Sequence, residues 1–235
     1  MSELLTSVRL GSWAAARFLI LSAAVFVAGI AAILLVLRVV DPPLSAVMLR
    51  DKLRGARVES QWMPLDRISP HLVRAVISSE DAHFCSHWGV DLRELSRALR
   101  TAQENGLNRV RGASTLTMQV AKNLFLWTDR SIPRKALELA ITPLIEVLWP
   151  KRRILEVHLN IAQWGHGLFG AEMAARRYFD KPAADLDARE ASLLAVALPA
   201  PGHRSPGSAS RRVEAIATRL RARMSSPASD FGCVL

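Results

Sequence analysis

The side chains best able to do chemistry lie together in residues 80–91. Glu80 and Asp81 are adjacent carboxylates, and Phe84, His87 and Asp91 follow shortly after them. A carboxylate can accept a proton from a hydroxyl group when its pKa is raised toward neutrality, so this group of residues suits general base catalysis. The alternative interpretation is a solvated helix end, where Glu–Asp pairs are common.

The segment before Glu80 has the pattern of an amphipathic helix. Ser69 and Pro70 are residue types preferred at the N-cap and at the first helical position. The spacing predicts a helix with Glu80 in its last turn, where the negative partial charge of the helix end would raise the pKa of the carboxyl group. The apolar stripe of this helix is made of Leu72, Val73, Val76 and Ile77.

Residues 114–125 form a second group of polar side chains. With Ser114 as the N-cap, Thr115, Gln119 and Lys122 recur on one face of a predicted helix. An ammonium group beside hydroxyl and amide groups is a suitable lining for a pyrophosphate. The alternative is the ordinary solvated face of an amphipathic helix. The opposite, apolar face consists of Leu116, Val120 and Leu124.

A third motif places a cation and a carboxylate one helical turn apart. Arg134 and Glu138 are i and i+4 neighbours, so their side chains share a face. Taken alone, this spacing favours a surface ion pair worth about 0–1 kcal/mol. A fourth block, residues 153–179, is rich in small residues that permit close helix packing, which indicates a mainly structural role.

Composition and charge bound the class of protein. The chain has 235 residues, of which 50% are hydrophobic, and a formal net charge of +10, which favours an anionic partner or surface. Its two cysteines, Cys85 and Cys233, are too few for a disulfide framework, and we expect both to be free thiols. His83 and His87 have the spacing of a zinc pair but lack an evident third ligand, so no metal site is predicted.

An apolar run near the N-terminus predicts a membrane span. Phe18 to Leu37 carries no charged residue and is about 20 residues long, enough for a helix to cross a hydrocarbon core of roughly 30 Å. A cleaved signal peptide is the alternative, and the length of the run favours a retained signal anchor. Basic residues are more numerous after the run than before it, which by itself would leave the downstream domain in the cytoplasm.

The rest of the chain reads as a series of helices. Asp91 with Glu94 and Asp187 with Glu190 have the pattern of capping boxes, the first opening a helix that Gly106 ends. Pro199 stops the helix that the second box opens, and Pro133 and Pro150 occupy predicted first helical positions. We expect a segment 1–17, an anchor 18–38, a linker 39–57, an α-rich domain 58–224 and a tail 225–235.

In this order the motifs resemble the peptidoglycan glycosyltransferases, the bacterial family that polymerises lipid II into glycan strands. The resemblance covers residues 58–206 and consists of three patterns: Glu-Asp-x-x-Phe-x-x-His-x-Gly from Glu80, Gly-x-Ser-Thr-x-Thr-x-Gln-x-x-Lys-Asn from Gly112, and Arg-Lys-x-x-Glu from Arg134. Residues 159–170, together with the absence of a transpeptidase domain from the printed sequence, are similar to the monofunctional biosynthetic branch. Departures from the pattern are Met118 for glutamine, Gln163 for glutamate and Asp180 for glycine.

The resemblance implies an all-α, lysozyme-like glycosyltransferase domain with a small membrane-proximal lobe around residues 92–113, preceded by one transmembrane helix. It also implies the reaction, in which the C4 hydroxyl of an acceptor lipid II attacks C1 of the growing chain with inversion and undecaprenyl pyrophosphate leaves. The implied catalytic residues are Glu80, as general base, and Glu138. The implied substrate-binding residues are Asp81, Phe84, His87, Ser114, Thr115, Gln119, Lys122 and Arg134.

The same resemblance fixes the expected partners and location. It implies lipid II and the nascent glycan strand as ligands, proteins of cell-wall synthesis or division as partners, and no cofactor, while leaving dependence on a divalent cation open. Because lipid II is exposed on the outer leaflet, the domain would lie on the periplasmic side of the inner membrane, against the charge count. The arginine-rich segment 211–223 would be a solvated helix near anionic lipid, without a nucleic-acid partner.

Two other functions remain open from the sequence. A lytic glycosidase would use paired carboxylates on the same class of fold to cleave glycan strands. A membrane-anchored scaffold without activity would make the acidic pair incidental.

Overall fold

The computed structural model describes residues 2–105, 114–129, 131–199, 204–226 and 229–235. These residues form two compact units, one up to Val40 and one from Asp41 to Leu235. The first unit is the single helix α1 (Ser2–Leu37). Its stretch Ile20–Leu37 is long and apolar enough to cross a membrane, which is what a single-pass membrane anchor requires.

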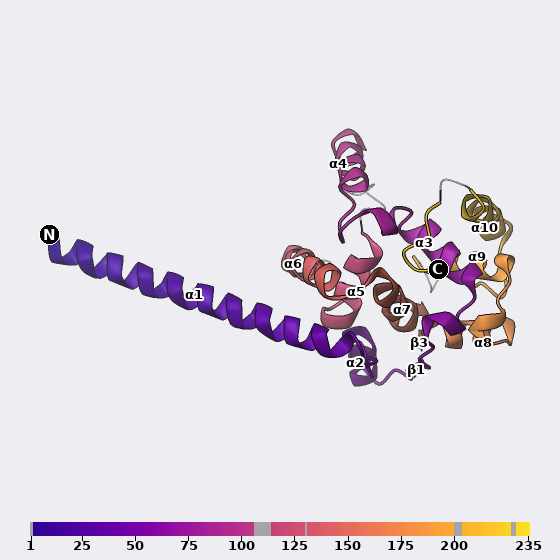
Figure 1. The fold of residues 1–235 in the computed structure, drawn as a ribbon, viewed down its shortest axis with the longest axis horizontal. Coiled ribbons are helices and arrows are strands. Elements are labelled where there is room, and N and C mark those ends of the chain that lie inside the picture. The colour runs from indigo at the N-terminus through magenta and orange to yellow at the C-terminus, as the bar shows by residue number, and fades with distance from the viewer. Residues whose placement is uncertain (1, 106–113, 130, 200–203, 227–228) are drawn as a thin grey trace. The chain divides into compact units, whose positions relative to one another are not determined.

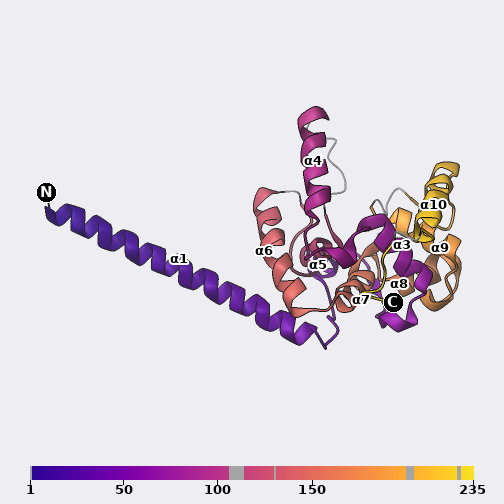
Figure 2. The same cartoon turned by 45° about the horizontal axis from the view of Figure 1, so that its top comes forward.

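The second unit is built mainly of helices (Figures 1 and 2). The described residues also form the short 3₁₀ helices η1 (Leu65–Arg67), η2 (Phe84–Ser86) and η4 (Ala183–Asp185). The α-helices are α2 (Ala46–Leu53), α3 (Pro70–Glu80), α4 (Leu92–Asn105), α5 (Leu116–Phe125), α6 (Ile132–Leu148), α7 (Lys151–Ile161), α8 (Ala171–Phe179), α9 (Ala188–Ala197) and α10 (Arg211–Met224).

A small sheet accompanies the helices, although the sequence indicated an all-α domain. Its strands β1 (Glu59–Ser60), β2 (Gln163–Gly165) and β3 (Leu168–Phe169) have the order β1-β3-β2, with β1 parallel and β2 antiparallel to β3. Strands of two or three residues are too short to show an alternating pattern of apolar and polar residues. The helical class is therefore confirmed, with a minor sheet added.

The helices form two packed groups. The α5 helix packs against α6 and α7, whereas α3 packs against α9 and α10. The predicted apolar face of α5 is confirmed, because Leu116, Val120 and Leu124 are buried. Glu80 is the last residue of α3, and its side chain contacts α5 of the other group, so the region of interest lies where the two groups meet.

Most of the predicted helix boundaries are found. The hydroxyl of Ser69 caps α3, and the Asp187–Glu190 box opens α9, which ends at Ala197. A carboxylate oxygen of Asp91 accepts hydrogen bonds from the backbone N–H groups of Arg93 and Glu94 at the start of α4. Gly106, expected to end that helix, and residues 107–113 of the expected lobe lie outside the described residues.

Three boundaries differ from prediction by one residue. The N-cap of α5 is Thr115, whose hydroxyl accepts from the backbone N–H of Met118 at 3.2 Å, so Ser114 is not the cap. Pro150 is the N-cap of α7, one position before its first residue. Pro133 is the second residue of α6, which begins at Ile132. Ser, Thr and Pro are all common near helix starts, so composition alone could not choose between neighbours.

Asp180 departs from the family pattern at a position with an unusual backbone. It follows α8 in the left-handed conformation, with φ 55° and ψ 36°. Glycine is favoured there because it has no Cβ, and Asn or Asp are the side chains that tolerate this conformation best. The substitution of glycine by aspartate is therefore compatible with the same helix end.

The expectation of two free thiols is wrong. Cys85 in η2 and Cys233 near the end of the chain form a disulfide that joins positions 148 residues apart. The tail is also held by Val234, which is buried and whose carbonyl accepts a hydrogen bond from Arg152 at 2.8 Å. No local pattern in the sequence brings these two cysteines together, since the pairing depends on where the tail packs.

Candidate active site

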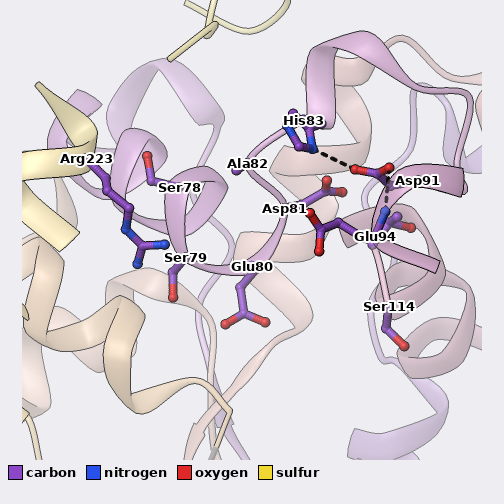
Figure 3. A pocket seen from close by; sticks show the side chains of 11 residues that line it. Ser78, Ser79, Glu80, Asp81, Ala82, His83, Asp91, Glu94, Ser114 and Arg223 are labelled. Atoms are coloured by element: carbon purple, nitrogen blue, oxygen red, sulfur yellow. Dashed lines mark hydrogen bonds and ion pairs between the residues drawn. The ribbon is translucent and has the colours of Figure 1, made fainter. Parts of the chain in front are cut away.

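Glu80 lies in the wall of a cavity of about 230 Å³ (Figure 3). The end of α3 with the turn that follows it and the end of α10 lie on one side of this cavity, and the starts of α4 and α5 lie on the other (Figure 3). We call it the Glu80 cavity. Its lining residues are Ser78, Ser79, Glu80, Asp81, Ala82, His83, Asp91, Glu94, Ser114, Thr115 and Arg223.

The surroundings of Glu80 favour its protonated form. Burial raises the pKa of the Glu80 carboxyl group, and the neighbouring charge of Asp81 acts in the same direction. The amide of Gln119, which donates a 2.9 Å hydrogen bond to Glu80, and the positive charge of Lys122 oppose this shift without cancelling it. The direction agrees with the sequence argument, but burial, and not the helix end, is the main cause.

Asp81 fixes the geometry next to Glu80. One of its carboxylate oxygens accepts the backbone N–H of Leu116 at 2.9 Å, and the other lies 2.8 Å from Nε2 of His87. Thr115 adds a second tie between the same segments by donating its hydroxyl to the carbonyl of Gly89. These contacts join the end of α3 to the start of α5, so Asp81, His87 and Thr115 hold the two functional helices together.

Gly89 and Phe84 shape the turn that follows Glu80. The backbone of Gly89 has a φ of 81°, and a Cβ atom there would lie 2.6 Å from the methyl group of Thr142. Only glycine fits such a position without strain. Phe84 is fully buried and lies beneath the ammonium group of Lys151, 4.5 Å from its ring centroid. These two motif residues therefore serve to shape the turn.

A buried network behind the turn was not found from the sequence. Glu146 accepts a hydrogen bond from the Thr117 hydroxyl at 2.5 Å and pairs with Lys151 at 2.9 Å. Lys151 also donates to the carbonyl of His87 at 2.7 Å. The contacts connect residues far apart in the chain, and no spacing rule predicts them.

A second cavity of about 190 Å³ lies beside the polar face of α5, and we call it the Lys122 cavity. It is lined by Gln119, Lys122 and Asn123, and also by Gln163, one of the departures from the family pattern. Burial lowers the pKa of the Lys122 ammonium group, although the negative charges of Glu138 and Glu80 oppose the shift. Lys122 therefore lies within electrostatic reach of both predicted catalytic carboxylates.

Glu138 is enclosed by cations. Its side chain is 3% exposed, and it pairs with Arg134 at 2.6 Å and with Lys135 at 2.5 Å. Lys135 also donates to the hydroxyl of Ser114 at 3.2 Å, which joins this group to the Glu80 cavity. The i,i+4 spacing favoured a surface ion pair, but the pair is buried because α6 packs against α5. Lys135 was given no role, although its i,i+3 spacing to Glu138 was visible in the sequence.

One group of side chains has possible ligand atoms close enough together to hold a metal ion. Ligand atoms of His83, Asp91 and Glu94 lie within 4.8 Å of one another. His83 and Asp91 already share a 2.7 Å hydrogen bond, and Asp91 caps α4. His87, the other member of the suggested zinc pair, bonds Asp81 instead. The Glu94 carboxylate pairs with Arg97 at 2.5 Å.

Comparison with known proteins places this arrangement in a family. A family model described as Transglycosylase matches residues 48–225, more than half of the chain. The chain belongs to the transglycosylase family. It is 50% identical to the biosynthetic peptidoglycan transglycosylase of Rhodospirillum centenum over 90% of this chain and 94% of the relative. The protein of the same name from Jannaschia sp. is 48% identical over 76% and 74%, respectively. The helical architecture fits the lysozyme-like fold that the sequence indicated.

Proposed function

We propose that the chain is a peptidoglycan glycosyltransferase that polymerises lipid II into glycan strands. The observation that carries this proposal is the position of Glu80, which lines one cavity and accepts a hydrogen bond from Gln119, which lines the other. The hydroxyl of an acceptor sugar and the pyrophosphate-bearing C1 of a donor need such neighbouring sites. The C4 oxygen of the acceptor forms a bond to C1 of the donor as the bond from C1 to the pyrophosphate oxygen breaks, and the hydroxyl proton passes to Glu80.

Glu80 is the general base of this reaction. It takes the proton of the acceptor hydroxyl as the new glycosidic bond forms, and a carboxylate with a raised pKa does so more effectively near neutral pH. Gln119 and Lys122 keep a share of the side chain ionised, because both favour its charged form. A share of Glu80 is therefore ionised, and its raised pKa makes this carboxylate a stronger base.

The cations around Glu138 serve the leaving group. Undecaprenyl pyrophosphate departs with negative charge, which Lys122 and Arg134 stabilise. Glu138 orients Arg134 and Lys135 through its two ion pairs and keeps these cations in place before substrate arrives. In this assignment the carboxylate of Glu138 acts through its neighbours, and the proton transfer belongs to Glu80.

The disulfide supports a location outside the cytoplasm. Disulfides persist in oxidising compartments such as the bacterial periplasm and are rare in the cytosol. Long domains also translocate largely regardless of flanking charge, so the basic residues after α1 do not prevent this orientation. We therefore place the second unit on the periplasmic face of the inner membrane. Protease added to intact spheroplasts should remove it, and protection until lysis would contradict this orientation.

Purified full-length protein in detergent, offered lipid II and, separately, intact sacculi, tests the function. Glycan polymer from lipid II is the expected product. Soluble muropeptides released from sacculi, without polymer from lipid II, would show a lytic glycosidase instead. Polymerisation that is unchanged in Glu80→Gln would remove the assigned base.

A further inference from the structure

The disulfide joins the tail of the chain to the turn that follows Glu80. Cys85 lies in η2, five positions after Glu80, and its partner Cys233 lies beyond the end of α10. In the pattern Glu-Asp-x-x-Phe-x-x-His-x-Gly, Cys85 stands at a position where any residue is accepted. The motif therefore does not account for this cysteine, although the cysteine lies inside it.

The turn that contains Cys85 contacts helices on the far side of the Glu80 cavity. Two residues before it, Nδ1 of His83 lies 2.7 Å from a carboxylate oxygen of Asp91, the residue that caps α4. Two residues after it, Nε2 of His87 lies 2.8 Å from Asp81, whose other oxygen bonds the start of α5. A shift of this turn would therefore disturb the start of α4 and the carboxylate next to the proposed base.

Apart from the disulfide, few contacts fix residues 229–235 to the domain in the described part of the chain. Val234 is buried, and its carbonyl accepts a hydrogen bond from Arg152 at 2.8 Å. The guanidinium group of Arg74 lies 5.7 Å from the ring centroid of Phe231. The other hydrogen bonds lie within this tail or join it to the end of α10. Because ordering each residue costs conformational entropy, these contacts alone hold the tail weakly.

The disulfide is open to attack by a thiolate. Cys85 and Cys233 are both half-buried, so a part of each residue reaches solvent. Partly exposed disulfides are more readily exchanged than fully enclosed ones. The sequence contains no other cysteine, so the two thiols of a reduced molecule can re-form only this bond within the chain. The bond can therefore be broken and restored without a change of pairing.

We propose that the Cys85–Cys233 disulfide is a site of thiol–disulfide exchange that controls the activity of the Glu80 cavity. In the oxidised form the bond fixes the tail against the turn, and the site is active. In the dithiol form the tail separates from the turn and catalysis slows. This inference rests on the proposed function, because polymerisation is the activity that is controlled.

The partner that this chemistry requires is a dithiol oxidoreductase with a Cys-x-x-Cys site, in which one thiol has a lowered pKa. Its thiolate attacks one sulfur of the disulfide, which gives a mixed disulfide and one protein thiolate that takes up a proton. The second thiol of the partner then breaks the mixed disulfide and releases the second protein thiol. The protein gains two electrons and two protons, and the partner is left with a disulfide. The reverse exchange restores the bond.

The test is polymerisation by full-length protein purified in the oxidised form, before and after reduction by dithiothreitol. On reduction kcat/KM for lipid II should fall roughly threefold to tenfold, the equivalent of one weakened hydrogen bond in the turn. Oxidised glutathione should restore the activity as it restores the bond. The assay temperature is set below the unfolding transition of the reduced protein, so that loss of the fold does not lower the rate.

Two variants serve as controls. The double variant Cys85→Ser with Cys233→Ser should have the activity of the reduced wild type, with or without dithiothreitol. Val234→Ala weakens the packing of the tail but keeps the bond, so the oxidised variant should retain nearly the wild-type kcat/KM. Unchanged activity of wild-type protein in which both thiols are shown to be free would overturn the inference. An equal loss of activity in oxidised Val234→Ala would overturn it as well.

Amide hydrogen exchange separates this inference from the proposed function. Reduction of wild-type protein should speed exchange in residues 81–91 and 229–235, whatever reaction the site catalyses. Faster exchange in a protein that makes no polymer in either form would remove the proposed function and keep a turn that responds to reduction. Polymer from the oxidised protein, with neither its rate nor its exchange altered by reduction, would keep the function and remove the inference.

Discussion

The two carboxylates to which we assign roles, Glu80 and Glu138, lie in opposite kinds of environment. Glu80 accepts a hydrogen bond from the neutral amide of Gln119, and burial raises the pKa of its carboxyl group. Glu138 is almost completely buried and accepts contacts from Arg134 and Lys135 at 2.6 and 2.5 Å. The carboxylate of Glu80 can therefore accept a proton, whereas the negative charge of Glu138 is already paired with two cations.

The two environments suit two different requirements of a glycosyl transfer reaction. Proton transfer needs a base that is not neutralised by cations, and departure of a pyrophosphate needs cations that are already positioned. Lys122 interacts electrostatically with both groups, since the negative charges of Glu80 and Glu138 each act on the pKa of its ammonium group. Because one carboxylate is unpaired with a cation in the described part of the chain and the other forms two ion pairs, substitution of each should have a different effect.

The largest expected effect is on activity, in Glu80→Gln. Loss of the base should lower kcat for lipid II polymerisation by about 10²–10⁴-fold. Because the neutral amide removes the cost of burying a charge, the free energy of unfolding should not fall by more than about 1 kcal/mol. Denaturant unfolding of the same preparation checks this, and an unfolded Glu80→Gln protein would contradict the comparison.

The second effect is on stability, in Glu138→Gln. Removing the charge leaves the buried guanidinium of Arg134 without its partner, and breaking a buried ion pair costs about 3–5 kcal/mol. The free energy of unfolding should therefore fall much more than in Glu80→Gln. Equal stability of the two variants would show that the environments of the carboxylates do not differ as described.

The third effect concerns the disulfide beside the Glu80 turn. Cys85→Ser with Cys233→Ser should lower the free energy of unfolding by about 2–4 kcal/mol, because the bond closes a loop of 148 residues in the unfolded chain. Reductant should destabilise the wild type by a similar amount. The double variant is its own control, since the chain contains no other cysteine and reductant should leave that variant unchanged.

The smallest effect concerns His158 on α7, whose ring nitrogens have no hydrogen-bond partner in the described structure. Burial, with the charge of Lys122, lowers the pKa of His158 to about 3. The unfolded chain binds a proton near pH 6.5, so stability falls as the pH drops from there toward 3, by about 2 kcal/mol at pH 5. His158→Leu should remove this part of the pH dependence, and replacement of the exposed His166 should not.

Local patterns were sufficient for the elements that carry the site. The N-cap Ser69, the apolar stripe of α3 and the i,i+4 spacing of Arg134 and Glu138 all depend on neighbours within a few residues. They placed Glu80 at a helix end and put Arg134 and Glu138 on one helix face, although the pair is buried and not on the surface as the spacing alone had favoured. The polar face of α5 followed from the same periodicity, although its N-cap was displaced by one residue to Thr115.

Contacts between distant segments could not be predicted in this way. The Cys85–Cys233 bond, the contact of Lys151 with the turn carbonyl of His87 and the position of Arg223 in the Glu80 cavity all depend on how helices pack in three dimensions. The main cause of the raised pKa of Glu80, its burial, also depends on how the helices pack. Its position at a helix end was visible in the sequence, but its burial was not.

The pH dependence of lipid II polymerisation in wild-type protein and Gln119→Leu tests most directly whether Glu80 is the base. The acidic limb of kcat/KM should lie above pH 4.5 in the wild type, since the pKa of Glu80 is raised from that value and the base must be ionised. Gln119→Leu removes a donor that favours the ionised form, so the limb should move to higher pH. A limb that stays in place in Gln119→Leu would show that another group accepts the proton.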